Sequence, residues 1–166
     1  MKTLIPAVVL LMLYLCFICC VILSDAQLPD RIATHFDFHG QPDGWASRSS
    51  YMLFIIIFGT GLTLFIVFVG FVLRFVPDKF INLSNREYWL APERRVETRN
   101  YIIRQMLWFT CWWVCFVIGM HFSLIDANNR VPVQLPNWEI YGLLAIFIAG
   151  TLVWILIIMR HFKRTI

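Results

Sequence analysis

Four long apolar stretches constrain what this chain of 166 residues can fold into. They run over residues 4–23, 51–75, 105–125 and 140–159. Each has roughly 20 or more residues, and at ~1.5 Å per residue a helix of that length crosses the ~30 Å hydrocarbon core of a bilayer. Because backbone amides find no water in hydrocarbon, they must bond within their own segment. The sequence predicts an all-α integral membrane protein, folded as a four-helix transmembrane bundle.

The composition supports one membrane domain rather than a soluble core. Hydrophobic residues make up 60% of the chain, far more than a soluble domain of this length buries. The lipid bilayer is therefore the first expected partner. We treat residues 1–166 as a single membrane domain, with connections at 24–50, 76–104 and 126–139.

The Lys and Arg residues are sorted by connection, which predicts the orientation of the chain. Residues 24–50 and 126–139 hold three of the fourteen basic residues. The other eleven are Lys2, Arg74, Lys79, Arg86, Arg94, Arg95, Arg99, Arg104, Arg160, Lys163 and Arg164. We expect both termini and residues 76–104 in the cytoplasm, with the other two connections facing outward, in a multi-pass protein of the cell (cytoplasmic) membrane. The net charge of +4 then indicates contact with anionic headgroups, not with nucleic acid.

The N-terminus also admits a second interpretation, a cleaved signal peptide. Lys2, the apolar run and the small residues Ser24 and Ala26 fit that pattern. A signal core usually has ~7–15 residues, and this run has about 20, so a retained span is favoured. Cleavage would leave the sidedness of the other three spans unchanged.

The first outward connection contains a predicted strand and turn. Over residues 31–39 apolar and polar residues alternate with a period of two. The face expected to be apolar carries Ile32, Thr34, Phe36 and Phe38, and the polar face carries His35, Asp37 and His39. Residues 40–44 supply Gly and Pro turn chemistry, and Trp45 returns the chain toward the membrane interface. This small extended motif is the most informative soluble segment of the chain.

His35, Asp37 and His39 also raise the alternative of a metal site, because imidazole and carboxylate groups bind zinc or copper. Same-face neighbours on a strand lie ~6–7 Å apart, so three in a row seldom converge on one ion without a bend. His121, near the outer end of the third stretch, is an ionisable residue close to membrane depth and a candidate to join them. The metal site remains one of two alternatives, and the favoured one is a structural or ligand-contact role for the polar face.

Two motifs carry a family resemblance. The segment 28–45 resembles the hallmark of a prokaryotic membrane domain of unknown function, and residues 85–94 are similar to the Asn-x-x-Tyr-Trp-Leu pattern that follows the second span in relatives. Matching positions in the first motif are Pro29, Ile32, His35, Phe36, Gly40, Asp43 and Trp45. Asn is usual in that family where this chain has Asp37. The same domain forms the N-terminal part of Sdp-type immunity proteins, which protect a cell from its own peptide toxin, relay its presence to a regulator and carry further spans.

The connection 76–104 is predicted to end in a helix that runs on into the third stretch. Pro92 suits a first helical turn, and residues 93–104 are highly charged. One interpretation is a basic collar facing lipid and solvent. The other, implied by the resemblance, is a docking surface for a cytoplasmic regulator. The residues expected to serve either role are Tyr88, Trp89, Arg94, Arg95 and Arg99.

Three classes of function follow. The favoured one is recognition, of an immunity or signalling kind, in which the outward loop binds a peptide, an envelope component or a partner protein. A transporter or channel component, in which a homo-oligomer builds the pore, is second. A metal-dependent membrane enzyme is third, because no nucleophile is paired with a base; we expect no catalytic residues and no cofactor. The residues expected to bind the ligand or partner are His35, Phe36, Asp37, Phe38, His39, Gly40, Asp43, Trp45 and His121.

Overall fold

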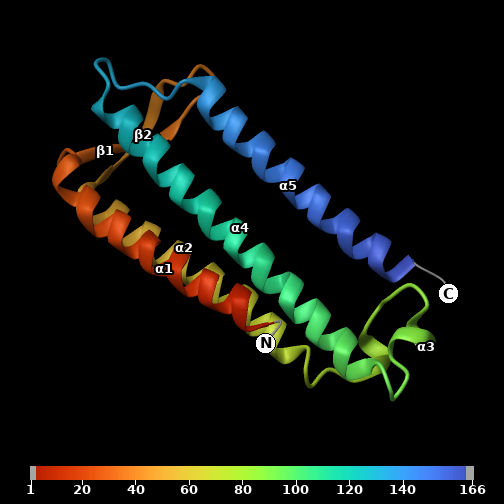
Figure 1. Cartoon of the computed structure of the whole chain (residues 1–166). Helices are drawn as coiled ribbons and strands as arrows, with labels where there is room; N and C mark the ends of the chain where they lie inside the picture. The colour runs from red at the N-terminus through yellow and green to blue at the C-terminus, as the bar shows by residue number, and fades with distance from the viewer. Residues whose placement is uncertain (1–2, 164–166) are drawn as a thin grey trace.

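The computed structural model describes residues 3–163 and is dominated by four long helices that run side by side (Figure 1). They are α1 (Leu4–Ser24), α2 (Arg48–Val72), α4 (Arg95–Asn129) and α5 (Asn137–Lys163). Each is long and apolar enough to cross a membrane, so the four predicted spans are confirmed at that level. Lys2 and Arg164, which entered the charge count, lie outside the described residues.

The helices differ in length from the apolar stretches that predicted them. α2 ends at Val72, three residues before the predicted end of the second stretch, and the chain then turns toward Pro77. α4 begins at Arg95 and has 35 residues, or ~50 Å at 1.5 Å per residue. It therefore extends beyond a ~30 Å hydrocarbon core. This agrees with the prediction that one continuous helix runs from the charged connection into the third stretch.

α4 is the central element of the bundle. It packs against α1, α2 and α5, and Figure 1 shows α1 and α2 together on one side of it and α5 on the other. The tightest packing joins the first group. Phe17 of α1 is 2% exposed, and a Cβ built on Gly59 of α2 would lie 2.5 Å from its ring. A small residue at position 59 thus lets the two helices approach closely, as in other membrane bundles.

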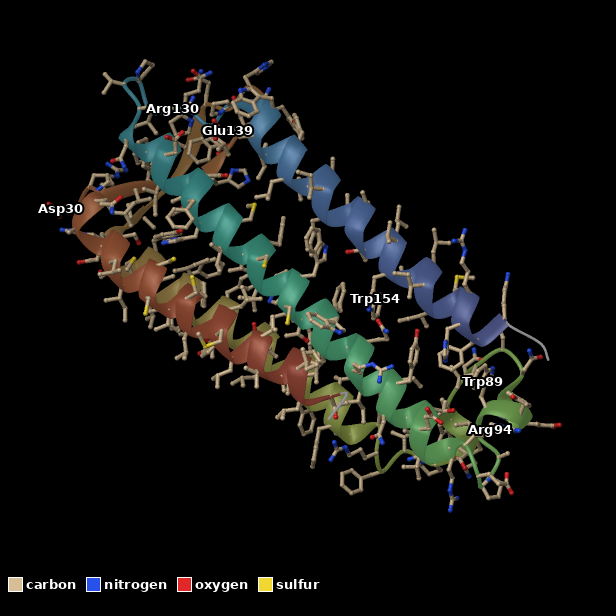
Figure 2. All side chains as sticks on the ribbon, in the orientation of Figure 1. Asp30, Trp89, Arg94, Arg130, Glu139 and Trp154 are labelled. Carbon is tan, nitrogen blue, oxygen red and sulfur yellow. The ribbon has the colours of Figure 1, made fainter. Side chains whose placement is uncertain are left out.

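α5 is attached to α4 by tryptophan side chains. The indole nitrogen of Trp112 donates to the carbonyl of Phe147 over 3.3 Å, and that of Trp154 donates to the carbonyl of Gln105 over 3.0 Å. Figure 2 shows Trp154 between the two helices. A Cβ on Gly150 would lie 2.5 Å from the Trp112 ring, so only glycine at position 150 leaves room for that ring. Among the described residues of α5, only Phe162 is classed as buried.

A two-stranded antiparallel hairpin follows α1 and a short 3-10 turn, η1 (Asp25–Gln27). Its strands are β1 (Arg31–Phe36) and β2 (Pro42–Ser47), with Ala33 opposite Trp45. Asn128 of α4 fastens the hairpin to the bundle: its side chain accepts from the Ala33 amide over 2.8 Å and donates to the Ala33 carbonyl over 2.9 Å.

The predicted alternation along the first strand is wrong. Ile32 and Ala33 are both fully buried, and Phe38 is 86% exposed. Two physical causes account for this. The strand register shifts between Ala33 and Phe36, and Asn128 holds the strand against the end of α4, so neighbouring residues both become covered. Phe38 lies beyond the end of β1, in the turn.

The connection between α2 and α4 contains η2 (Asp78–Phe80) and a one-turn helix, α3 (Arg86–Trp89). Arg99, on the second turn of α4, ties this connection to the end of α2. Its guanidinium donates to the carbonyls of Leu73, Arg74 and Val76 and pairs with Asp78. These carbonyls belong to residues that directly follow α2, where the chain has left the helix and its backbone acceptors need other donors.

Candidate functional site

A pocket of about 610 Å³ lies between the hairpin and the adjoining ends of α4 and α5. Six of the nine residues predicted to bind a ligand line it: His35, Phe36, Asp37, Phe38, Gly40 and Asp43. The remaining wall comes from positions that sequence reasoning did not single out: Thr34, Met120, Ser123, Leu124, Leu135, Asn137, Ile140 and Tyr141. The pocket therefore combines an apolar floor from two helices with a polar rim from the hairpin.

His35 and Asp43 form the polar pair of this rim. The Nδ1 atom of His35 lies 2.5 Å from Oδ1 of Asp43, and the two side chains are 75% and 49% exposed. Because an ionised carboxylate only accepts hydrogen bonds, Nδ1 donates and Nε2 is left for another partner. A Cβ on Gly44, opposite His35 in the hairpin, would lie 2.8 Å from the His35 Cβ. Glycine at that position makes room for the imidazole.

Asp37 shapes the turn of the hairpin through one oxygen of its carboxylate. Its Oδ1 atom accepts from the amides of His39 and Gln41, both over 2.8 Å. The Gln41 hydrogen bond is the largest influence on the carboxyl; desolvation opposes it, and the amide and the charge of His39 reinforce it, so the pKa of Asp37 is lowered. His39 is exposed in this turn and does not line the pocket.

The tip of the hairpin is clamped to the start of α5. The Leu135 amide donates to the Gly40 carbonyl over 3.0 Å, and the Asn137 side chain donates to the Phe38 carbonyl over 2.8 Å. Gly40 has a φ of 75°, and a Cβ there would lie 2.1 Å from the Leu135 carbonyl oxygen. Both the backbone conformation and the close approach require glycine. This clamp closes one side of the pocket.

A second link joins α4 to α5 at the same end. Arg130 donates to Asp126 from Nε over 2.8 Å and to Glu139 over 2.5 Å, and Figure 2 shows Arg130 and Glu139 close together at this end of the bundle. The hydrogen bonds to Asp126 are the main cause of a raised pKa for Arg130, against a smaller desolvation effect and with Glu139 adding to it. The guanidinium thus bridges the end of α4 and the start of α5.

His121 lies below the hairpin rather than in the pocket, and only 1% of it is exposed. Its Nε2 atom is 2.8 Å from the Ser24 hydroxyl and its Nδ1 atom 2.6 Å from the Tyr51 hydroxyl. Ser24 donates its own hydrogen to the Val21 carbonyl, so Nε2 donates to Ser24 and Nδ1 accepts from Tyr51. The three side chains fasten α1, α2 and α4 together. Sequence reasoning did not predict the roles of Ser24 and Tyr51. The one signal in the sequence was that each carries a hydroxyl at the end of an apolar stretch.

The remaining candidate residues are distributed between the two ends of the molecule. Trp45 is 42% exposed on the hairpin, with the Arg31 guanidinium 5.6 Å from its ring. Tyr88, Trp89 and Arg94 line a separate pocket at the opposite end (Figure 2), whereas Arg99 is engaged with the end of α2 and Arg95 lines neither pocket. Within residues 3–163, no three His, Cys, Asp or Glu residues are placed to hold a metal ion together.

Four helices long and apolar enough to cross a bilayer define the class of the chain as a multi-pass membrane protein, with a small hairpin at one end of the bundle. Residues 4–60, which comprise α1, the hairpin and the first half of α2, match the model of a family described as a domain of unknown function, DUF1648. Comparisons with curated proteins and with solved structures found no match.

Proposed function

We propose that the protein is a recognition protein of the cell membrane, which binds a peptide, or an exposed segment of a partner protein, in the pocket at the hairpin end. In this proposal both termini and the basic connection face the cytoplasm, and the hairpin faces outward, as the distribution of Lys and Arg favours. The observation that carries the proposal is the pocket itself, of about 610 Å³, with its apolar floor and polar rim.

The pocket has the chemistry that an extended peptide needs. Met120, Leu124 and Ile140 offer an apolar surface for a side chain. The free Nε2 atom of His35 and the Tyr141 hydroxyl are placed around the pocket as polar partners for a peptide backbone. Phe38, 86% exposed at the edge, supplies an aromatic surface of the kind that dominates protein interfaces.

The position of α5 supports a signalling role for the same pocket. α5 forms one wall of the pocket, and its far end contacts Trp89, which donates to the Phe162 carbonyl over 3.1 Å. A ligand that changes the spacing of α4 and α5 would therefore move the surface that carries Tyr88, Trp89 and Arg94. A cytoplasmic regulator docking there, as the resemblance to immunity proteins implies, would read that movement. Neither step requires a cofactor, a catalytic residue or nucleic acid.

Photo-crosslinking in native membranes tests the proposal. A photoreactive phenylalanine analogue replaces Phe38, and adducts are identified by mass spectrometry. The matched control carries the analogue at Val131, which is 99% exposed at the same end of the molecule but does not line the pocket. We expect a discrete peptide or protein adduct at position 38, absent at 131 and reduced by the substitutions His35→Ala and Tyr141→Ala.

Three results would contradict recognition. Labelling of lipid or of the chain itself at both positions would leave the pocket without a partner. A conductance in vesicles reconstituted with the purified protein would favour the transporter or channel class, with a homo-oligomer forming the pore. Stoichiometric bound zinc that is lost on His35→Ala would favour the metal-dependent class instead.

A further inference from the structure

A second pocket, of about 710 Å³, lies at the opposite end of the bundle, where the beginnings of α1 and α4 meet α3 and the end of α5. It is independent of the proposed outer site. Its wall carries both signs of charge, on α4 and on the two residues before it: Glu93, Arg94, Glu97 and Arg104. Four aromatic rings also line it: Tyr88, Trp89, Tyr101 and His161. A basic collar alone would not place two carboxylates in the same pocket as its arginines.

The aromatic wall is held in place by its own contacts. The Tyr101 ring stacks on His161 with centroids 3.8 Å apart and an interplanar angle of 11°. Trp89 is fixed by its hydrogen bond to the Phe162 carbonyl, and its own carbonyl accepts from the buried Thr98 hydroxyl over 2.7 Å. The pocket is thus a built feature that joins the first turns of α4 to the last turn of α5, as Figure 2 shows around Trp89.

The two arginines of the pocket are not equivalent. Arg94 lies over the Tyr88 ring, 3.9 Å from its centroid, and donates to the Tyr88 carbonyl over 3.4 Å. Arg104 lies 5.2 Å from the Tyr101 ring, and within residues 3–163 no carboxylate forms a salt bridge with it. Arg104 therefore has donors to spare for an anion in the pocket.

The charges are also ordered by depth. Arg104 directly precedes the apolar stretch of α4, and Glu97 lies seven residues earlier, ~10 Å nearer the aqueous end at 1.5 Å per residue. Glu93 lies in the turn before α4 and lines the same pocket. A phospholipid with an amine headgroup has the same order, because its phosphate lies next to the glycerol and its ammonium lies farther from the acyl chains. The tyrosine and tryptophan rings are side chains that favour this interfacial depth.

We propose that this pocket binds the headgroup of a zwitterionic phospholipid that carries a primary ammonium, such as phosphatidylethanolamine. Arg104 holds the phosphate with charge-assisted hydrogen bonds, and Glu97, with Glu93 beside it, accepts the N–H groups of the ammonium. A lipid without an ammonium leaves the two carboxylates unpaired. A lipid bound here touches α4 and α5 at once and stabilises their docking at the inner end.

Lipid titration of the purified full chain, followed by native mass spectrometry, tests this assignment. The probes are phosphatidylethanolamine, phosphatidylglycerol, which has the phosphate but no ammonium, and free phosphoethanolamine. We expect phosphatidylethanolamine to bind at least about tenfold more tightly than phosphatidylglycerol, the size of one lost charge-assisted hydrogen bond. Arg104→Gln should weaken both lipids, and Glu97→Gln should remove the preference. Arg95→Gln, a collar substitution outside the pocket, should change neither.

Several results would overturn the assignment. Equal or tighter binding of phosphatidylglycerol, strengthened by Glu97→Gln, would reduce the pocket to a general basic collar. Binding of free phosphoethanolamine without retention of the lipid would point to a soluble ligand. If Arg104→Gln fails to fold, Arg104→Lys preserves the charge, and Glu97→Gln, on an exposed residue, still decides the preference for the ammonium.

Discussion

The molecule has two regions that are built differently: a three-helix body of α1, α2 and α4 with the hairpin on its end, and the single helix α5. In the body, Phe17 fills the space above Gly59, and the buried Ser24–His121–Tyr51 chain satisfies every polar group it contains. On α5, side chains such as Ile148 and Leu152 are each 55% exposed, and the helix is held along one seam and at its two ends.

This difference indicates where the molecule can change shape. The body is fixed by interlocking contacts among three helices, so no one helix of it can move without breaking buried packing. α5 can shift against α4 by loosening one seam, and it forms walls of both the outer and the inner pocket. Ligands at either end would therefore act on the same α4–α5 interface, whereas the body serves as the scaffold.

The largest expected effect comes from breaking the body. Phe17→Ala should lower the free energy of unfolding by about 3–5 kcal/mol, because it empties a closed position against Gly59 and leaves a cavity. Ile148→Ala on α5, at a side chain that faces away from the protein, is the matched control and should cost far less. Equilibrium unfolding in mixed micelles, followed by far-UV circular dichroism, measures both. Similar losses for the two variants would contradict the distinction between body and α5.

The second prediction separates α5 from an intact body. Gly150→Leu places a side chain where the Trp112 ring lies, and overpacking of this kind costs about 1–3 kcal/mol. We expect the distance between spin labels on α4 and α5 to increase, while a label pair on α1 and α4 keeps its distance. Gly142→Leu, at a glycine with open space beside it, is the control and should leave both distances unchanged. Global loss of helicity in Gly150→Leu would show that α5 is part of the body.

The third prediction concerns the buried polar chain. Tyr51→Phe removes the donor to the Nδ1 atom of His121 and leaves that nitrogen unsatisfied, at a cost of about 1 kcal/mol in a membrane interior. Ser24→Ala should act in the same direction. A double-mutant cycle with His121 measures the coupling, and strict additivity would show that the three side chains do not act as one network.

The sequence predicted the elements that depend on local composition. Four spans and the long α4 follow from runs of apolar residues and from the charged lead-in at residues 93–104, because lipid requires helices whatever the tertiary contacts are. The end of α2 was placed three residues too late, since Leu73 and Phe75 are as apolar as the helix before them. Just past that end, the carbonyls of residues 73, 74 and 76 are taken by Arg99 of a different helix, a tertiary contact that the apolar pattern does not reveal.

The pocket was predicted only in part, for a related reason. The hairpin residues stood out because their types alternate and their turn chemistry is local. The opposite wall, from Met120 to Tyr141, belongs to two spans that look like ordinary lipid-facing sequence. Ser24, Tyr51 and His121 are spread over three spans, and their shared depth becomes a contact only when α1 and α2 pack side by side against α4.

The smallest expected effect tests the turn of the hairpin, where Asp37 acts through one oxygen. Asp37→Asn keeps an Oδ1 acceptor for the His39 and Gln41 amides, so the turn should form as before; the family that the sequence resembles usually has Asn at this position. Asp37→Ala removes the acceptor and should speed hydrogen exchange at those two amides. Comparison of Asp37→Asn with Asp37→Ala separates the effect of the hydrogen bonds on the turn from the effect of the charge.

Acid distinguishes them further. Because the pKa of Asp37 is lower in the folded turn than its unfolded value of about 3.9, its contribution to stability is complete above that value and is lost as the pH falls through the folded pKa. Protection of the Gln41 amide should thus weaken below about pH 4 in the natural chain and stay constant in Asp37→Asn. Equal acid responses in the two chains would assign the loss of protection to another titrating group. They would mean that Asp37 acts as a hydrogen-bond acceptor and that its charge contributes nothing to the turn. Either result leaves the body unaffected, since Asp37 contacts neither α1 nor α2 through its hydrogen bonds.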